Sequence, residues 1–140
     1  MDKLRVLFLC TGNSARSQMA EALLKKLGGE RFEVFSAGLD PKGIHPMTVK
    51  VMGEEGIDIK DYRSKSLDEF LGKMHFSYVI TVCGHADKNC PSVFPGALNR
   101  LHWEFKDPAA FIGSDEEKLF EFRQIKDQIK SRIMEWLEQL

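Results

Sequence analysis

The sequence predicts an α/β fold: one domain over residues 1–140, in which a four-stranded parallel sheet is flanked by helices on both faces. Two observations lead to this fold class. Short apolar runs typical of buried strands alternate four times with segments of helical periodicity, and no internal repeat or low-complexity linker interrupts them. The length of 140 residues and the hydrophobic content of 43% suit one hydrophobic core, so we expect one domain.

The first half of the chain predicts two strand–helix units. Residues 4–9 form a nearly continuous apolar run, as in a strand buried on both faces of a parallel sheet. Apolar residues then recur at helical spacing over 20–27, and Gly28-Gly29 predicts the end of that helix. Aromatic and β-branched residues at 32–37 predict the second strand, and Pro46 suits the first turn of a second helix. The residues of that helix expected to face inward are Val49 and Met52.

The second half predicts two further strands and two helices. Residues 66–69 have the form of a capping box, which predicts a short helix before a strand at 78–82. Residues 84–96 contain two prolines and little periodicity, which predicts a long functional loop. Apolar and polar residues alternate over 101–105, as on an edge strand with one wet face. A second capping box at 114–117 then begins a long amphipathic helix.

The composition excludes several classes of partner. Twenty basic and 21 acidic residues are spread along the chain, so there is no basic stripe and we expect no nucleic-acid partner. No apolar stretch approaches the roughly 20 residues that cross a bilayer. Residues 3–9 are too short for a signal peptide, so we expect a cytoplasmic protein without a membrane partner. In that reducing compartment three cysteines indicate catalysis, redox exchange or metal binding rather than structural disulfides.

Three chemically capable side chains follow predicted strands. Cys10 comes after the first strand, Cys83 after the third, and Asp107 just beyond the fourth. In open parallel sheets, ligands bind outside the carboxyl ends of the strands. We therefore expect these three side chains to collect at one edge of the sheet.

The segment from Cys10 to Arg16 has the form Cys-x5-Arg between a strand and a helix, where backbone N–H groups can surround a tetrahedral anion. These dipoles and Arg16 would favour the thiolate of Cys10, which is then a nucleophile, and the planar fork of Arg16 can hold two anion oxygens. Ser17 is placed to donate a hydrogen bond to the sulfur. The residues expected to bind the anion are Thr11, Gly12, Asn13, Ser14, Ala15 and Arg16.

Two residues of this loop have further expected roles. Gly12 would permit a backbone angle that a residue with Cβ resists. Asn13 would tie the loop to itself. The alternative for the whole segment is a buried cysteine at a strand end and an arginine in solvent; the preceding strand, the Gly-Asn-Ser interior and the following helix favour the oxyanion site.

Asp107-Pro108 lies at the predicted active edge, where an acid could protonate an oxygen leaving the central atom of the anion. Asp before Pro is also ordinary turn or helix-capping chemistry, which is the alternative. The presence of a Cys-x5-Arg loop at the same edge favours the acid.

Cys83 and Cys90 are separated by six residues, and a bent loop or a helical turn could bring their Cα atoms to the roughly 5.5 Å of a disulfide. They could instead be two small buried hydrophobes, although Cys90 lies in a polar loop beside a proline. With His85 and Cys10 they could also be imagined as zinc ligands, but the spacing lacks paired Cys-x2-Cys units, so we expect no metal site. The remaining histidines, expected as surface or packing residues without partners, are His45, His75 and His102.

Taken together, the segment Cys10–Ser17, Asp107-Pro108 and the Cys83/Cys90 pair resemble the thioredoxin-coupled arsenate reductases, which share the fold of low-molecular-weight protein tyrosine phosphatases. The resemblance spans essentially the whole chain, including Ser36-Ala37-Gly38 and the segment 103–108. It implies a four-stranded parallel sheet flanked by helices.

The resemblance also implies a reaction. Cys10 attacks arsenate, Arg16 and the loop amides hold the oxygens, and Asp107 protonates the departing hydroxyl. Cys83 then attacks the Cys10 sulfur, arsenite leaves, and Cys90 attacks Cys83 to give a disulfide that thioredoxin reduces. No cofactor besides thioredoxin as electron donor is implied.

The chain departs from the family pattern in two places. Many relatives carry a further cysteine, not needed for the relay, where this chain has Ala15. Some bind potassium through Asn13, Glu21, Ser36 and an acidic residue within 62–66; here that segment reads Tyr-Arg-Ser-Lys-Ser, which argues against a cation site.

Two other functions stay open. A phosphatase of the same fold would resolve the covalent intermediate with water instead of Cys83; against it, Ala109-Ala110 stand where the phosphatases carry tyrosines. A zinc-bound or redox-sensing module would only bind an oxyanion in the loop. A monomer is the default expectation for the oligomeric state.

Overall fold

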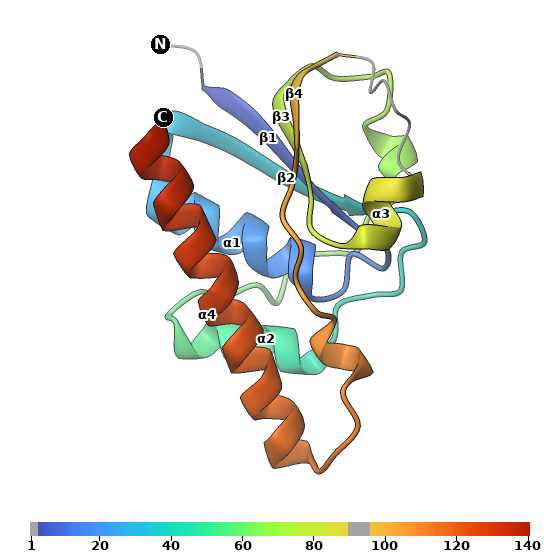
Figure 1. Cartoon of the computed structure of the whole chain (residues 1–140), viewed down its shortest axis with the longest axis vertical. Coiled ribbons are helices and arrows are strands. Elements are labelled where there is room, and N and C mark those ends of the chain that lie inside the picture. Colours follow the sequence, from blue (N-terminus) through green and yellow to red (C-terminus); the bar gives the residue numbers. More distant parts are fainter. Residues whose placement is uncertain (1–2, 90–95) are drawn as a thin grey trace.

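The computed structural model describes residues 3–89 and 96–140, and its sheet confirms the predicted fold class. Four parallel strands lie in the order β2-β1-β3-β4, with helices on both faces (Figure 1). The strands are β1 (Leu4–Cys10), β2 (Phe32–Gly38), β3 (Phe76–Thr81) and β4 (Ala97–His102). The α-helices are α1 (Arg16–Gly28), α2 (Pro46–Glu54), α3 (Gly84–Asn89) and α4 (Asp115–Gln139). Three short 3-10 helices are η1 (Gly29–Arg31), η2 (Leu67–Glu69) and η3 (Pro108–Ala110).

The register of the sheet brings the carboxyl ends of the strands together. Cys10 pairs with Gly38 across β1 and β2, and Leu9 pairs with Thr81 across β1 and β3. Thr81 in turn pairs with His102 of β4. The segments that follow these residues therefore emerge at one edge of the sheet, as predicted.

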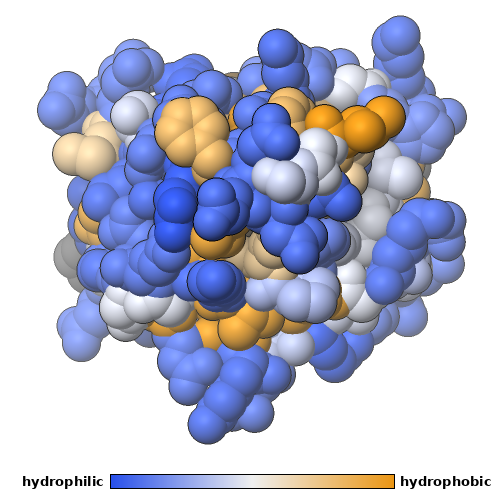
Figure 2. Space-filling model, turned by 90° about the horizontal axis from the view of Figure 1, so that it is seen from below, coloured by the Kyte–Doolittle hydropathy of each residue, from blue (hydrophilic) through white to orange (hydrophobic). Residues whose placement is uncertain are grey.

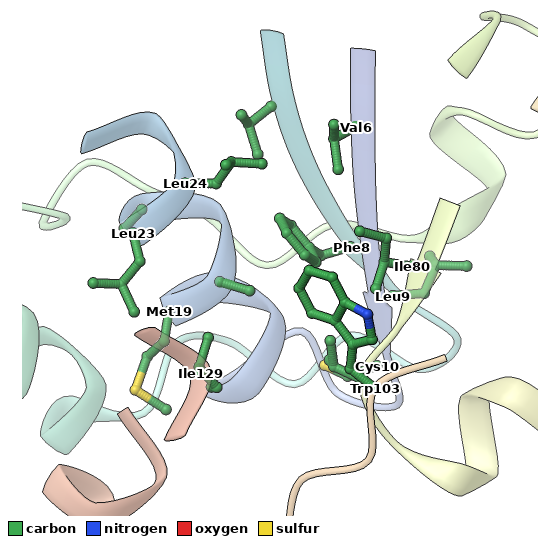
Figure 3. Close-up of a cluster of buried hydrophobic side chains, with 14 of the residues drawn as sticks. Val6, Phe8, Leu9, Cys10, Met19, Leu23, Leu24, Ile80, Trp103 and Ile129 are labelled. Carbon is green, nitrogen blue, oxygen red and sulfur yellow. The ribbon is translucent and has the colours of Figure 1, made fainter. Parts of the chain in front are cut away.

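The hydrophobic core lies on both sides of the sheet. Helices α1, α2 and α4 lie together on one side, and α3 lies on the other near the ends of the strands (Figure 1). Leu24 of α1 points toward the strands, where Phe8 of β1 is buried, whereas Met19 lies on the side of α1 that faces away from Phe8; both belong to one core with Ile129 of α4 (Figure 3). Each such fully buried side chain contributes about 1.5–3 kcal/mol to stability. This packing fixes β1 and α1, and so fixes the two ends of the loop between them.

The outer surface differs from this core. Seen from the end of the molecule at which α2 and the start of α4 lie, the surface is mainly hydrophilic, and apolar side chains show between the polar ones (Figure 2). Among the described residues, none of the helices combines the length and the hydropathy needed to cross a membrane.

Helix termini follow the predicted signals in one case and not in another. The capping box before α4 is present: Ser114 Oγ accepts from Glu117 N at 3.2 Å, and Glu117 Oε1 accepts from Ser114 N at 3.0 Å. The segment 66–69 forms only the single turn η2, because its Glu69 pairs with Arg63 instead of closing a capping box.

Three expectations need correction. Residues 84–89 form helix α3 rather than loop, and its Ala86 is buried against the sheet; residues 90–95 lie outside the described part. The predicted edge strand is β4, which ends at His102, because β3 ends at Thr81 and leaves later residues without a neighbouring strand. Trp103 and Phe105 are buried beyond it, and Trp103 N still donates to Thr81 O at 2.8 Å. In α2 the fully buried residues besides Met52 are Thr48 and Val51, whereas Val49 is half-buried.

Candidate oxyanion site

The loop from Thr11 to Ala15 leaves the end of β1 and leads directly into α1. A neighbouring segment takes up its carbonyl groups: Asp40 N donates to Thr11 O at 2.8 Å and Lys42 N to Gly12 O at 3.0 Å. No side chain of the described residues caps the N-terminus of α1. The first N–H groups of this helix therefore keep their hydrogen-bonding capacity for an anion, and the helix dipole adds positive potential there.

Cys10 is buried at the base of this loop, with two hydrogen-bonding groups on its sulfur. Asn13 N donates to Cys10 Sγ at 3.1 Å, and Ser17 Oγ lies 2.8 Å from the same atom. Asn13 Nδ2 donates to Ser17 Oγ at 2.7 Å and so holds this hydroxyl beside the sulfur, where it can donate to a thiolate. Donors that point at sulfur stabilise the thiolate relative to the thiol.

The glycine that this loop needs is not the one expected. Asn13 has φ +48°, whereas Gly12 lies outside the left-handed region, and a Cβ at Gly12 would meet only ordinary contacts at 3.7 Å. The expectation for Gly12 is therefore wrong. At Gly38, on the end of β2, a Cβ would lie 2.6 Å from Thr11 O and 2.8 Å from Asn13 N, so only glycine lets the strand approach the loop.

Remote segments hold the loop from below. Asn13 Oδ1 accepts from Lys65 N at 2.8 Å, and Asn13 Nδ2 also donates to Ser36 Oγ at 3.0 Å. Ser64 Oγ contacts the carbonyl oxygens of Gly12 and Asn13 at 2.9 and 3.0 Å. Asn13 thus ties the loop to α1, β2 and the segment 63–65. Sequence reasoning missed Ser64, which belongs to no motif.

A buried carboxylate, Glu21, lies behind this network. Ser36 Oγ donates to Glu21 Oε1 at 2.5 Å, Lys25 Nζ lies 2.6 Å from Oε2, and Lys65 Nζ lies 3.8 Å from Oε1. Burial lowers the pKa of Lys65, although the charge of Glu21 opposes this change. Burial also disfavours the charged form of Lys25, but the hydrogen bond and charge of Glu21 outweigh it and raise the pKa of Lys25. Two ammonium groups therefore compensate this carboxylate.

The pocket above Cys10 has a volume of about 160 Å³. Two cationic side chains, Arg16 and Lys42, and one carboxylic acid, Asp107, are among its lining residues. Arg16 Nη1 donates to Phe105 O at 3.1 Å, and Arg16 Nη2 lies 3.8 Å from Asp107 Oδ2. Asp107 also accepts from Ala109 N at 3.0 Å as the N-cap of η3, so it is at once the turn residue and an acid at the pocket. The residues lining the pocket are Cys10, Thr11, Gly12, Ser14, Ala15, Arg16, Lys42, Asp107 and Ala109. Sequence reasoning missed Lys42, because a lysine in a turn carries no signal of its own.

Cys83 lies beside the same loop. Its buried sulfur is 3.5 Å from Thr11 Oγ1 and accepts from Ala86 N of α3 at 3.3 Å. Cys10 and Cys83 are both free thiols. Cys90, the third predicted cysteine of the relay, lies outside the described residues.

Two histidines expected to lack partners have them. His45 Nδ1 accepts from Met47 N at 3.1 Å as the N-cap of α2, and its ring lies 4.8 Å from that of Phe122. His102 contacts Thr81 and Glu104 close to α3. Among the described residues there is no group of three or more potential metal ligands.

Residues 5–140 match the low molecular weight phosphotyrosine protein phosphatases, and the chain belongs to this family. Within it, the chain is 47% identical over 139 residues to an arsenate reductase of Halalkalibacterium halodurans, covering 99% of this chain and 98% of that protein. These likenesses confirm the resemblance that the motifs indicated.

Solved structures show the same relation. An arsenate reductase in the phosphate binding state matches with a TM-score of 0.77 at 31% identity, covering 97% of this chain and 98% of that chain. A thioredoxin-dependent arsenate reductase of Corynebacterium glutamicum matches with a TM-score of 0.72 at 33% identity, covering 98% of this chain and 61% of that chain.

Proposed function

We propose that this protein is an arsenate reductase with Cys10 as the nucleophile and Cys83 and Cys90 as successive resolving thiols. The observation that carries the proposal is the second thiol: Cys83 lies beside the anion loop, 3.5 Å from Thr11 Oγ1. A phosphatase has no use for a thiol there. The arsenate reductases to which the chain is similar support the same assignment.

The first step joins sulfur to arsenic. The Cys10 thiolate attacks the As(V) atom of arsenate, while the α1 N-terminus and Arg16 bind its oxygens. Asp107, 3.8 Å from Arg16 Nη2, donates a proton to the departing oxygen, which leaves as water. The product is a Cys10–S–As(V) adduct with arsenic still fully oxidised.

The second step is the reduction. The Cys83 thiolate attacks Cys10 Sγ and forms a disulfide, and the sulfur–arsenic bond breaks with its electron pair on arsenic. Arsenic leaves as arsenite, As(III), and the two sulfurs have supplied two electrons. Cys90 then attacks Cys83, which frees Cys10, and the dithiol of thioredoxin reduces the Cys83–Cys90 disulfide. The thioredoxin-dependent relative supports this choice of donor.

Helix α3 must change shape during this relay. Its six residues separate Cys83 from Cys90 in the sequence, and two positions seven residues apart in a continuous helix are about 10.5 Å apart along its axis. A disulfide needs Cα atoms within roughly 4.4–6.8 Å. The segment therefore unwinds or bends when the disulfide forms.

Turnover of arsenate with thioredoxin, thioredoxin reductase and NADPH tests the relay. Cys10→Ser should abolish NADPH consumption, whereas Cys83→Ser and Cys90→Ser should stop after a single turnover or less. Mass spectrometry of the stalled variants should then find a Cys10 adduct and a Cys10–Cys83 disulfide, respectively. Sustained turnover by Cys90→Ser would remove the relay from the mechanism.

A second candidate function is hydrolysis of phosphate monoesters, which the family membership and the shared loop favour. The same Cys83→Ser variant distinguishes the two activities, because water rather than Cys83 resolves a phosphocysteine. We expect weak hydrolysis of p-nitrophenyl phosphate that survives in Cys83→Ser and disappears in Cys10→Ser. Hydrolysis far more efficient than arsenate reduction would make the protein a phosphatase.

We also propose that the protein acts as a cytoplasmic monomer.

We propose further that the anion loop works without a bound potassium ion. Lys65 places an ammonium group beside Glu21, so an added cation there would meet a like charge. Reduction rates should be equal in potassium, sodium and choline chloride at one ionic strength. A rate that rises specifically with potassium would contradict the proposal.

A further inference from the structure

A lysine at the rim of the pocket above Cys10 has no part in the reaction described so far. Among the described residues that line the pocket outside the segment 11–16, Lys42 carries the only positive charge. Arg16 and the helix N-terminus already bind oxygens of the anion, and Asp107 supplies the proton. The structure therefore leaves one cation at the site whose role is still to be found.

The backbone around Lys42 is fixed against the anion loop. Four N–H groups of the segment 39–45 donate, one after another, to carbonyl groups of the segment 10–14. These bonds, at 2.8–3.2 Å, join Leu39 to Cys10, Asp40 to Thr11, Lys42 to Gly12 and His45 to Ser14. The place of residue 42 beside the loop thus follows from backbone contacts and does not depend on its side chain.

The side chain of Lys42 runs past the loop. A Cβ built on Gly12 would lie 3.7 Å from both Cγ and Cδ of Lys42, so the stem passes this glycine at van der Waals distance. The ammonium group lies 3.4 Å from Asp40 Oδ2, and the two side chains are 65% and 72% exposed. Ion pairs this exposed contribute little to stability. The ammonium group can therefore turn from Asp40 to an anion in the pocket at small cost.

The pocket has little to offer an organic group. Its volume of about 160 Å³ is below the roughly 300–1,000 Å³ of pockets that enclose drug-sized ligands. Besides Cys10, the hydrophobic residues that line it are Ala15 and Ala109, and no aromatic residue is among its described lining residues. An organic group at the rim would bury little apolar surface and would displace water from a charged side chain.

The reaction determines which oxygen of the anion faces the rim. Cys10 attacks from the base of the pocket, so the departing oxygen lies opposite the sulfur and points outward. In an organic ester this oxygen carries the carbon substituent. In a free oxyanion it carries at most a proton and can accept a hydrogen bond from an ammonium group.

We infer that Lys42 is a specificity-determining residue: its ammonium group donates to the outward oxygen and so favours free tetrahedral oxyanions over their organic esters. The inference rests on the proposed function in one respect, because it takes the pocket above Cys10 as the anion site. It adds that the site selects against esters at the rim, where a phosphatase must admit them.

Binding of inorganic phosphate and of phenylphosphonate, measured by calorimetry at one pH and ionic strength, tests the inference without turnover. Phenylphosphonate keeps three oxygens for the loop and has a ring in place of the outward oxygen. In Lys42→Met the dissociation constant of phosphate should rise about fivefold, the effect of one charged hydrogen bond at a partly exposed site. That of phenylphosphonate should fall, or rise by less than about twofold, because only the distant effect of the charge is lost. Equal rises for the two probes would overturn the inference.

The chain offers a matched control in Lys60. Its ammonium group lies 3.9 Å from Asp58 Oδ2, and these side chains are 71% and 67% exposed, but Lys60 does not line the pocket. Lys60→Met removes the same charge from the same kind of local pair and should bind both probes as wild type. A loss of phosphate binding equal to that in Lys42→Met would show that net charge alone is responsible, and would overturn the inference.

Two further measurements separate a charge contact from a displaced loop. Lys42→Arg keeps the charge and should preserve the wild-type ratio of the two dissociation constants. The difference in phosphate binding between wild type and Lys42→Met should shrink at high ionic strength, because salt screens exposed charges. A loss that salt does not change, or one that Lys42→Arg shares in full, would count against the contact.

Arsenate turnover separates this inference from the proposed function. A protein that shows these binding differences but does not reduce arsenate would disprove the proposed function and leave the selectivity of Lys42 for free oxyanions intact. Sustained arsenate reduction, together with one ratio of dissociation constants in wild type and Lys42→Met, would overturn the role of Lys42 alone.

Discussion

At the level of single residues, two side chains hold a hydrogen-bonding group beside the sulfur of Cys10. Ser17 Oγ receives a hydrogen from Asn13 Nδ2 and lies 2.8 Å from Cys10 Sγ; a thiolate can only accept, so toward a thiolate Ser17 is the donor. The two side chains act as a unit, since Asn13 is itself held by Lys65 N and Ser36. The reactivity of Cys10 thus depends on contacts made by residues up to 55 positions away in the sequence.

Ser17→Ala removes the donor and leaves Asn13 Nδ2 with one acceptor fewer. We expect the rate at which iodoacetamide alkylates Cys10 at pH 7 to fall about tenfold, because a hydrogen bond to a charged group contributes about 1.5–3 kcal/mol. Peptide mass spectrometry after timed quenching measures the rate at Cys10 alone. Ser131→Ala, at an exposed serine of α4, is the control and should leave it unchanged. A Ser17→Ala rate equal to wild type would mean that the hydroxyl does not stabilise the thiolate.

Gly38→Ala tests the contact between β2 and the loop. Its Cβ would lie 2.6 and 2.8 Å from backbone atoms of Thr11 and Asn13, so the loop must move. We expect phosphate binding, measured by calorimetry, to weaken at least tenfold, with a loss of about 1–3 kcal/mol in stability. Gly53→Ala is the matched control: nothing lies within 4 Å of its Cβ, and alanine in α2 should stabilise the protein by about 0.5–1 kcal/mol. Undiminished phosphate binding by Gly38→Ala would show that the loop tolerates the displacement.

At the level of elements, periodicity predicted the units that local sequence determines. The strands β1 and β2 and the long helix α4 have repeated apolar positions and clear terminal signals, and their bounds agree with the prediction to within a residue or two. Helix α3 has only six residues, too few for a periodic pattern, and its partners Arg100 and Glu104 lie in the next strand and just after it. The sequence of the segment itself does not reveal such tertiary contacts, so the helix could not be predicted from it.

The same distinction applies to the site. The loop from Cys10 to Ser17 was predictable because its chemistry is contiguous in the sequence. Ser64 and Lys42 were not predictable, because each belongs to a segment without a motif that only the fold brings to the loop. The alternation at Trp103 and Phe105 was misleading, because packing against α4 rather than strand pairing buries these side chains: the Trp103 ring lies 5.7 Å from that of Trp136.

The contact between α2 and α4 predicts a pH dependence of stability. Glu55 Oε1 accepts from Lys126 Nζ at 2.7 Å, and Lys130 Nζ lies 3.2 Å from Oε2. The hydrogen bond from Lys126 lowers the pKa of Glu55 below its ordinary value of 4.5. A carboxyl group whose pKa is lowered in the folded state stabilises the protein above that ordinary value, and this contribution is lost as pH falls through the folded-state pKa.

Glu55→Gln should therefore cost about 1–3 kcal/mol in the free energy of unfolding at pH 7, and less at pH 3. Urea denaturation at the two pH values measures both numbers. The control Glu138→Gln, at an exposed glutamate near the end of α4, should change neither by more than about 0.5 kcal/mol. An equal cost at both pH values would show that the carboxylate charge does not matter to the contact.

At the level of the whole molecule, the anion loop is a junction at which a strand, a helix and a distant segment of the chain are bonded together. It continues β1 into α1, it is bonded to Ser36 of β2 and to the segment 63–65 through Asn13, and it lies close against Gly38. An anion that orders this loop therefore stabilises the folded state as a whole. The unfolded chain has no such site, so binding and stability are linked.

Phosphate should accordingly raise the melting temperature. At a concentration 100 times its dissociation constant, the added stability is about 2.7 kcal/mol, or roughly 10 °C for a chain of this size. Arg16→Met should lose most of this rise, and Arg16→Lys should keep part of it, since lysine retains the charge but not the planar fork.

Differential scanning calorimetry measures the melting temperature of each variant with and without phosphate. Because Arg16 also bonds to Phe105 O, its loss lowers the melting temperature without ligand, so the shifts caused by phosphate are compared and not the melting temperatures themselves. Arg31→Met, which removes an exposed charge far along the chain from the loop, should retain the full shift. An equal shift in Arg16→Met and Arg31→Met would place the phosphate elsewhere and remove the physical basis for anion binding at Cys10.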